Sequence, residues 1–303
     1  MTLKPVSFND YPSLAPFFKL QPYRLCEYTL PSVIAWTNNE YYPCTAISGE
    51  FLLIGAEFNT RKENRHLLLP VSGSRIPTPR ELSKIAETFG YERYCFVPDH
   101  YLEAVGEASI ETFFEIIRSP EYDDYIYRTE DLAFLKGNRY SKKRNLIHQF
   151  NREFVERGRV AVEGISQANA SGCIEFIEKW CEERDCDQDP NIDLACELQA
   201  SVNMIENIDR ADVEGLAVRV DDVISAFGVG CRLTGDMGVL HFQKAFLNIK
   251  GLYQFFDSMC ARRLFGGFTY INKESDMGMP GLARAKKSYH PAMMVRAYEL
   301  ILR

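Results

Sequence analysis

The sequence lacks several features that would assign it at once to a class of protein. No run approaches the roughly 18 to 20 consecutive apolar residues that span a bilayer, and the N-terminal stretch MTLKPVSFNDYPSL has no apolar signal-peptide core. Nine cysteines are present, an odd number, with no CxxC pair among them. Neither a disulfide framework nor a zinc motif is indicated. We therefore expect a cytoplasmic protein with reduced, mostly buried thiols and no metal.

Basic charge is also scarce for a general nucleic-acid binder. The chain has 35 Lys and Arg residues against 42 Asp and Glu residues, a formal net charge of −7. Blanket affinity for nucleic acid needs a basic face, so this balance leaves room only for a local basic patch. With 303 residues, of which 46% are hydrophobic and 25% charged, the chain is long enough for two ordinary globular domains.

The second half of the sequence predicts an antiparallel meander followed by a helix and a strand. Residues 216–220 alternate in hydropathy up to a turn at 221–222, and Thr234-Gly235-Asp236 predicts a second turn into 237–246. Apolar residues at helical spacing follow Gly251, and 268–272 is a short aromatic and β-branched run. A short helix near 281–287 and a strand at 293–300 complete this half.

The first half predicts a similar order. Three short strands are expected within 44–71, and a capping box at Thr78-Pro79-Arg80-Glu81 begins a helix that ends near Gly90. A strand at 93–97, a helix from Ser109 through Ile117 and a strand at 123–128 follow. The recurrence of this order predicts two copies of one domain. We place them at 1–135 and 136–303, the second including the junction helix.

A basic stretch, KGNRYSKKRNLIHQF, occupies residues 136–150 at this junction. Helical spacing from Leu146 predicts a helix with Ser141 as its cap, which places cations in the first turn. The first turn exposes unpaired N–H groups and favours anions instead. We therefore expect a phosphate-bearing ligand there, with Tyr140 stacking on a base and Gly137 allowing close approach. The cations concerned are Lys136, Arg139, Lys142, Lys143 and Arg144. The alternative is a solvated linker, the usual role of a charge run.

Two segments carry a resemblance to a known family. DLAFLKGNRYSKKRNLIHQF at 131–150 and INKESDMGMPGLARAKKSYHP at 271–291 resemble segments of an uncharacterised family related to the C-terminal domain of phosphatidylglycerol lysyltransferase. The resemblance implies an α+β fold with two tandem GNAT-like (acyl-CoA N-acyltransferase-like) domains, each a mixed, mainly antiparallel sheet flanked by helices. It also implies transfer of an aminoacyl group from aminoacyl-tRNA to an acceptor that the sequence does not identify, with no required cofactor.

The second segment supplies candidate catalytic residues. Glu274 and Asp276 follow a predicted strand, and each could receive an ammonium group or act as a base. Solvated loop carboxylates are the alternative interpretation. Lys286, Lys287 and Tyr289 could place positive charge or a hydroxyl near an oxyanion or a phosphate.

His241 alternates with Val239 and Gln243, so we expect these three side chains to share one face of the sheet, with His241 a core histidine.

Two further functions stay open. Lys250 and Gly251 precede the central helix of the second half and could hold the pyrophosphate of acetyl-CoA, which would indicate an acyl-CoA-dependent N-acetyltransferase. The glycine-rich pattern of such enzymes is missing, and Gly251 could simply allow a chain turn. Loss of chemistry with retention of an anion-binding groove would instead leave a non-catalytic binding module.

Overall fold

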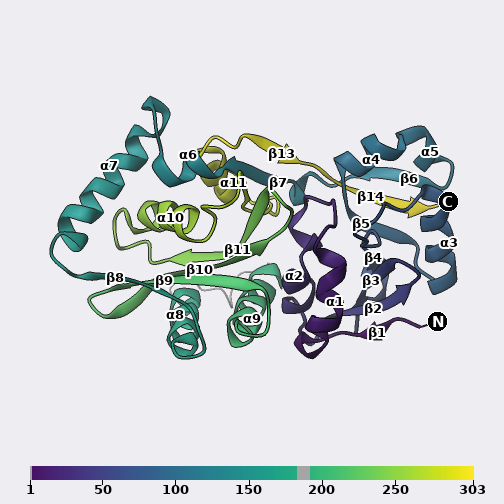
Figure 1. The fold of residues 1–303 in the computed structure, drawn as a ribbon, viewed down its shortest axis with the longest axis horizontal. Helices are drawn as coiled ribbons and strands as arrows, with labels where there is room; N and C mark the ends of the chain where they lie inside the picture. Colours follow the sequence, from purple (N-terminus) through teal and green to yellow (C-terminus); the bar gives the residue numbers. More distant parts are fainter. Residues whose placement is uncertain (1, 183–191) are drawn as a thin grey trace.

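The computed structural model describes residues 2–182 and 192–303. Two seven-stranded sheets form its framework, sheet A on the right of Figure 1 and sheet B on the left. Sheet A has the order β1 (Lys4–Pro5), β2 (Tyr41–Ser48), β3 (Phe51–Phe58), β4 (His66–Leu67), β5 (Arg93–Pro98), β14 (Ala297–Leu302), β6 (Phe114–Arg118). Sheet B has the order β13 (Met293–Val295), β7 (Asp124–Arg128), β12 (Tyr270–Asn272), β11 (Met237–Ala245), β10 (Val223–Arg232), β9 (Val213–Val220), β8 (Val160–Gly164).

Helices flank both sheets. Those of the first half are α1 (Tyr11–Phe18), α2 (Leu30–Ala35), α3 (Pro79–Phe89), α4 (Asp99–Val105), α5 (Glu107–Glu111) and α6 (Thr129–Phe134). Those of the second half are α7 (Ser141–Phe150), α8 (Ala170–Glu182), α9 (Ile192–Glu206), α10 (Leu252–Arg263) and α11 (Pro280–Lys287). Helices α8 and α9 lie below sheet B in Figure 1, and α7 and α10 lie above it. The predicted α+β class is therefore confirmed.

The two sheets have the same strand pattern when sheet B is read in reverse. Each contains three antiparallel strands, a helix and a strand that pairs in parallel with the third, namely β2–β3–β4–α3–β5 and β9–β10–β11–α10–β12. This succession supports the tandem interpretation. The last strand of each half lies in the sheet of the other half. Strand β7 lies between β12 and β13 in sheet B, and β14 lies between β5 and β6 in sheet A. Each sheet thus contains one strand from the other side of the division that we placed at 135/136.

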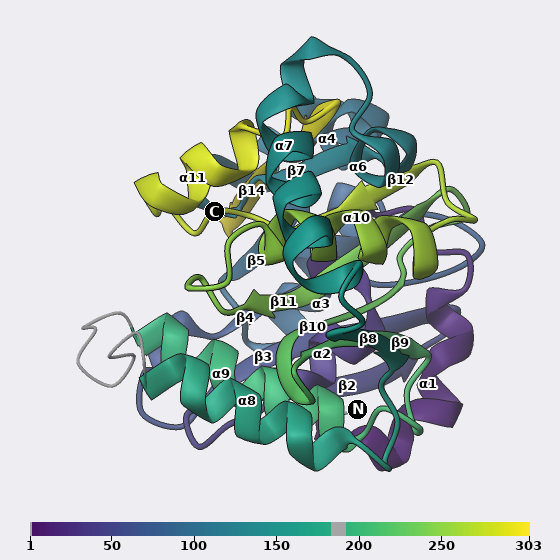
Figure 2. The ribbon, with the colours of Figure 1, turned by 90° about the vertical axis from the view of Figure 1, so that its left-hand side faces the viewer.

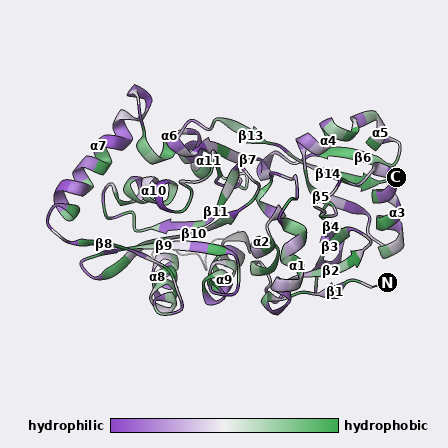
Figure 3. Ribbon diagram, viewed as in Figure 1, coloured by the Kyte–Doolittle hydropathy of each residue, from purple (hydrophilic) through white to green (hydrophobic). Residues whose placement is uncertain are grey.

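Apolar side chains form two cores around sheet B. One core is continuous from sheet A to the face of sheet B covered by α8 and α9, and includes Tyr28, Tyr94 and Phe227. The other lies between the opposite face and α7 and α10, and includes Phe150 and Phe256. Most residues of α7 are hydrophilic (Figure 3). No helix in the described part of the chain is long and apolar enough to cross a membrane.

Several local predictions are confirmed. Thr78 accepts the backbone N–H of Glu81 in a complete capping box, and Gly90 ends α3 in the left-handed conformation. The predicted helix from Ser109 through Ile117 is wrong in its second part, because α5 ends at Glu111 and β6 begins at Phe114. Alternate burial along β6 and its pairing with β14 outweigh the helical spacing of the apolar residues.

Helix α7 begins one residue earlier than its predicted cap allows. Ser141 is the first helical residue rather than the cap, and the preceding Tyr140 makes no side-chain capping bond. A 3₁₀ turn, η5 (Asn138–Tyr140), leads into the helix. The first turn holds cations and no acidic residue, as predicted.

A β-bulge in β11 changes the direction of its side chains. Val229 on β10 pairs with Phe242, and Gly230 pairs with Leu240, so His241 is left without a partner in the ladder. The extra residue reverses the alternation after this point. The prediction that His241 and Gln243 share a face is therefore wrong, since Gln243 contacts α10 and His241 contacts the opposite side.

Candidate functional site

The parallel strands β11 and β12 separate in the middle of sheet B. They pair only from Met237 to Val239 and from Tyr270 to Asn272. Beyond these pairs β11 continues to Ala245, whereas the chain leaves β12 at Lys273. The two strands thus open a gap in the ladder, and polar side chains from both strands gather around it.

His241 and Glu274 form a partly buried pair on the face of sheet B that is directed toward the N-terminal segment. Nδ1 of His241 lies 2.9 Å from Oε1 of Glu274, while Nε2 lies 3.1 Å from the Thr29 hydroxyl and 3.2 Å from Sγ of Cys231. Burial lowers the pKa of His241, but Cys231 and Glu274 outweigh it and raise the pKa to about 10. Side-chain exposure is 1% for His241 and 24% for Glu274, so Glu274 is the member that solvent reaches.

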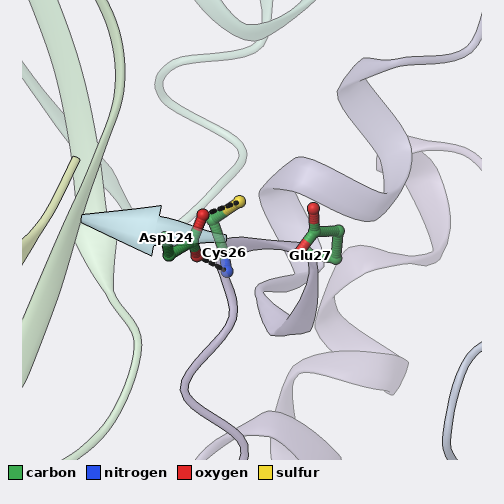
Figure 4. Close-up of side chains that lie close together, drawn as sticks. All are labelled: Cys26, Glu27 and Asp124. Carbon is green, nitrogen blue, oxygen red and sulfur yellow. Dashed lines mark hydrogen bonds between the residues drawn. The ribbon is translucent and has the colours of Figure 1, made fainter. Parts of the chain in front are cut away.

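A cluster of three side chains, Cys26, Glu27 and Asp124, lies beside this pair (Figure 4). Asp124, the first residue of β7, accepts the backbone N–H of Cys26 and the side-chain N–H of Asn272, each at 2.7 Å. Glu27 follows Cys26 in the 3₁₀ turn η2 (Cys26–Tyr28). Burial raises the pKa of Asp124 to about 7 and that of Glu27 well above its ordinary value. Cys26, Glu27 and Asp124 each offer one ligand atom within 4.8 Å of the others, and they are the described residues that could hold a metal.

Asn272 joins this cluster to Glu274. Its side-chain oxygen accepts the backbone N–H of Glu274 at 2.7 Å, and its amide nitrogen donates to Asp124. Lys286 of α11 adds a cation, because its ammonium group donates to the carbonyl oxygens of Lys273 and Glu274. Burial lowers the pKa of Lys286 against the attraction of Glu274. Asp276 lies apart from Glu274 in its contacts and accepts the Tyr125 hydroxyl at 2.6 Å.

Another polar cluster lies at the same gap on the opposite face of sheet B and is centred on Asp257 of α10. Oδ1 of Asp257 accepts Gln243 at 2.9 Å and also the ammonium group of Lys273. Oδ2 of Asp257 and the hydroxyl of Tyr289 are buried, and neither has a hydrogen-bond partner in the described part of the chain. Burial raises the pKa of Tyr289, and the charge of Asp257 adds to this effect.

Lys143 points from α7 toward this polar cluster. Its ammonium nitrogen lies 3.4 Å from the centre of the Tyr289 ring and donates to the Ser288 hydroxyl at 2.8 Å. Burial lowers the pKa of Lys143 to about 8. The structure thus brings two predicted site residues, Lys143 and Tyr289, into direct contact.

The other cations of the basic stretch turn toward the protein's own groups. Lys136 pairs with Glu130 and Arg139 with Asp131, each at 2.9 Å. Arg144 donates to the carbonyl oxygens of Leu135 and Gly137. Lys142 and Lys287 are exposed.

The prediction that Tyr140 stacks on a base is wrong. Its ring is fully buried, and its hydroxyl donates to the carbonyl oxygen of Tyr289 at 3.0 Å.

Gly251 has a packing role at the start of α10. Its φ is +84°, and a Cβ atom added there would lie 2.2 Å from the carbonyl oxygen of Leu146 in α7. Figure 2 shows α7 crossing in front of α10. The glycine therefore lets the two helices approach closely, which accounts for it without a phosphate. Lys250 beside it is exposed.

Some site residues carry little signal in the sequence. Asp257 and Lys273 sit among ordinary helix and loop residues, and Cys26 lies far from the two segments that resemble the family. Asp124 does have a signal, because it is a carboxylate at the start of an aromatic strand, YIYR, where an apolar residue is expected.

The meander, the central helix and the parallel strand that separates from the meander define an α+β protein of the GNAT-like class. The family model for the C-terminal region of phosphatidylglycerol lysyltransferase matches residues 34–300. The chain therefore belongs to this family, as the two quoted segments predict.

Solved structures have a similar fold. A conserved protein of unknown function from Bacteroides thetaiotaomicron is 24% identical, with 99% of each chain covered and a TM-score of 0.88. The C-terminal domain of a putative lysylphosphatidylglycerol synthetase from Agrobacterium fabrum is 11% identical, with 87% of this chain and 84% of that chain covered and a TM-score of 0.59. Both likenesses concern the fold. No curated protein sequence matches the chain.

Proposed function

We propose that the protein is an acyltransferase that moves an aminoacyl group from aminoacyl-tRNA to an unidentified acceptor at the gap between β11 and β12. One observation carries the proposal: polar groups on both faces of sheet B converge on this gap, although the surrounding strands are apolar. Membership of the lysyltransferase-related family supports the same reaction class. The acceptor is defined here only by its chemistry, as a nucleophile that loses a proton when it attacks an ester.

Transfer from an ester needs a group that takes the proton of the acceptor. Glu274 is suited to this role because its carboxylate is partly exposed and is held by His241. With a pKa of about 10, His241 carries a proton at neutral pH and orients Glu274 rather than acting as the base. The acceptor would give its proton to the Glu274 carboxylate as it bonds to the ester carbonyl carbon, and Glu274 would pass that proton to the ribose oxygen of tRNA as the ester bond breaks.

The transfer also needs positive charge near the carbonyl oxygen of the ester. Lys286 and Lys143 approach the gap from opposite sides, on α11 and α7. Either ammonium group can stabilise a developing oxyanion. The hydroxyl of Tyr289 is a further donor, since it is buried without a hydrogen-bond partner in the described part of the chain and Lys143 lies over its ring. We assign Glu274 and Tyr289 to the reacting groups and Asp276, bound to Tyr125, to the support of the loop.

The exposed edge of the basic stretch is the proposed contact for tRNA. Lys142 is exposed, and the Lys136–Glu130 pair is exposed on both sides, with side-chain exposures of 71% and 68%. Such surface pairs contribute little free energy, so phosphates can replace the carboxylates. Salt should weaken the resulting complex.

A binding experiment tests the donor. Charged tRNA, uncharged tRNA and acetyl-CoA are compared by thermal shift, and we expect the largest stabilisation with charged tRNA. The triple variant with Lys136→Glu, Arg139→Glu and Lys142→Glu should lose salt-sensitive binding, whereas the triple variant with Lys19→Glu, Lys62→Glu and Lys84→Glu, at exposed positions in the first half, serves as the charge-matched control. Arg144 is left unchanged because it donates to backbone carbonyl oxygens, and Lys143 because it belongs to the candidate site. Unchanged tRNA binding by the triple variant would reject the assigned surface.

A turnover experiment tests the site. Glu274→Gln keeps the shape of the side chain but cannot accept a proton, so release of the aminoacyl group to a trial amine should fall at least 100-fold. Binding of charged tRNA should stay within a factor of a few. A variant that transfers at the wild-type rate would remove Glu274 from the mechanism. Stabilisation by acetyl-CoA alone would favour the acyl-CoA-dependent reaction instead.

A further inference from the structure

We propose that Cys26, Glu27 and Asp124 form a zinc-binding site between the N-terminal segment and sheet B (Figure 4). Asp124 lies 98 residues after Cys26 in the chain, and no metal-binding spacing relates them in the sequence. Folding brings one ligand atom from each of the three residues to within 4.8 Å of the others. The site therefore reverses the expectation of no metal that the sequence suggests.

The donor atoms select the type of cation. One thiol sulfur and two carboxylate groups match the ligands that zinc takes in proteins. Magnesium and calcium prefer oxygen ligands alone, which makes the sulfur of Cys26 unfavourable for them. An ammonium group would gain little from the sulfur, because thiols are weak hydrogen-bond acceptors.

The carboxylate of Glu27 supplies an independent observation. Its Oε2 atom is buried and has no hydrogen-bond partner in the described part of the chain. A buried carboxylate oxygen without a donor is unfavourable, and a bound ion is one of the explanations for such an atom in a native structure. Zinc bound between Glu27, Cys26 and Asp124 would satisfy this oxygen.

Asp124 is held in the orientation that a ligand needs. Its Oδ2 accepts the backbone N–H of Cys26 and the amide of Asn272, each at 2.7 Å. This leaves Oδ1 directed at Cys26, 3.6 Å from Sγ. Hydrogen bonds from outside the ligand set that fix a ligand's orientation are typical of metal sites.

Three protein ligands leave a fourth position for water or another molecule. Asn272 connects the zinc site to Glu274, because it bonds both Asp124 and the backbone of Glu274. Zinc would thus tie the N-terminal segment to the start of β7, and Asn272 would connect that point to the candidate acyl-transfer residue Glu274. The inference does not depend on the proposed function, since it concerns binding alone.

The full-length protein is the material for the test. After removal of metals with a chelator, zinc is titrated by calorimetry, and cobalt(II) is titrated by absorbance because thiolate ligation produces a sulfur-to-cobalt charge-transfer band. We expect one zinc per chain and the appearance of this band. Cys26→Ser should abolish the band and weaken zinc binding at least tenfold. Glu27→Gln should also weaken zinc binding at least tenfold.

Cys44→Ser is the matched control, because Cys44 is also a buried free thiol but lies in β2 of sheet A. It should bind zinc and cobalt as the wild type does. Wild-type protein that takes up no zinc and gives no cobalt band would overturn the proposal, as would equal zinc binding by Cys26→Ser. Should Cys26→Ser fail to fold, the isosteric Glu27→Gln variant decides, and unaltered zinc affinity in it would also overturn the proposal. If methylamine stabilises the protein and zinc does not, the cluster binds an ammonium group instead of zinc, and the proposal is overturned.

Discussion

Replacing Gly251 by alanine tests whether helix packing explains this glycine. Two costs combine at this position. A residue with a side chain in the left-handed conformation, here at φ +84°, costs about 1 to 2 kcal/mol. The new Cβ would also lie 2.2 Å from the carbonyl oxygen of Leu146 and 3.1 Å from Cβ of Phe150, so α7 must move. Overpacking of this kind costs about 1 to 3 kcal/mol. We therefore expect Gly251→Ala to lower the free energy of unfolding by about 2 to 5 kcal/mol.

Urea unfolding followed by circular dichroism measures this loss, and two control variants divide it. Gly90→Ala has the backbone cost alone, because φ is +68° and nothing lies within 4 Å of an added Cβ. Gly267→Ala has neither cost, since its surroundings are also open and its φ is not in the left-handed range. We expect the order Gly251, Gly90, Gly267 from the largest to the smallest loss. If Gly251→Ala is no more destabilising than Gly90→Ala, close packing of α7 on α10 is refuted, and the phosphate interpretation of Gly251 regains support.

Three other predictions test the site and the exchanged strands. The pKa of Lys143 is about 8 in the folded protein against 10.5 in the unfolded chain, so the unfolded state binds more protons between these pH values and the free energy of unfolding should rise with pH there. Urea unfolding of Lys143→Met should lack this part of the rise. Tyr125→Phe deletes the 2.6 Å hydrogen bond to Asp276 and should lower the free energy of unfolding by about 1 to 3 kcal/mol, whereas no measurable loss would show that the bond does not form. Truncation after Val295 removes β14 from between β5 and β6, so hydrogen exchange should show loss of amide protection in both neighbours, and retained protection would contradict the observed strand order.

The sequence predicts secondary structure best where contacts between residues a few positions apart decide it. The capping box at Thr78 and the turn at 234–236 are recognisable because their residues satisfy backbone groups a few positions away. The segment from Ser109 to Ile117 was mispredicted because its apolar residues fit both periods, and pairing with the distant β14 decided for a strand. Exchange of β7 and β14 was not predicted, since alternation in a strand does not specify its neighbours.

The candidate site was predicted only in part for a similar reason. His241 was correctly expected to be buried, with three partners around its ring. Its face was wrong because a bulge depends on the partner strand β10 as much as on β11. Tyr140 shows the opposite error, since an aromatic residue among cations has the composition of a base-stacking site although its ring fills a core position.

The exchanged strands also affect how the protein folds during synthesis. Sheet A lacks the strand between β5 and β6 until the ribosome has made residues 297–302, near the end of the sequence. During that time the nascent chain exposes the open edges of β5 and β6, where another chain could pair. The first half produced alone would therefore lack the strand between β5 and β6, and the second half produced alone would lack β7.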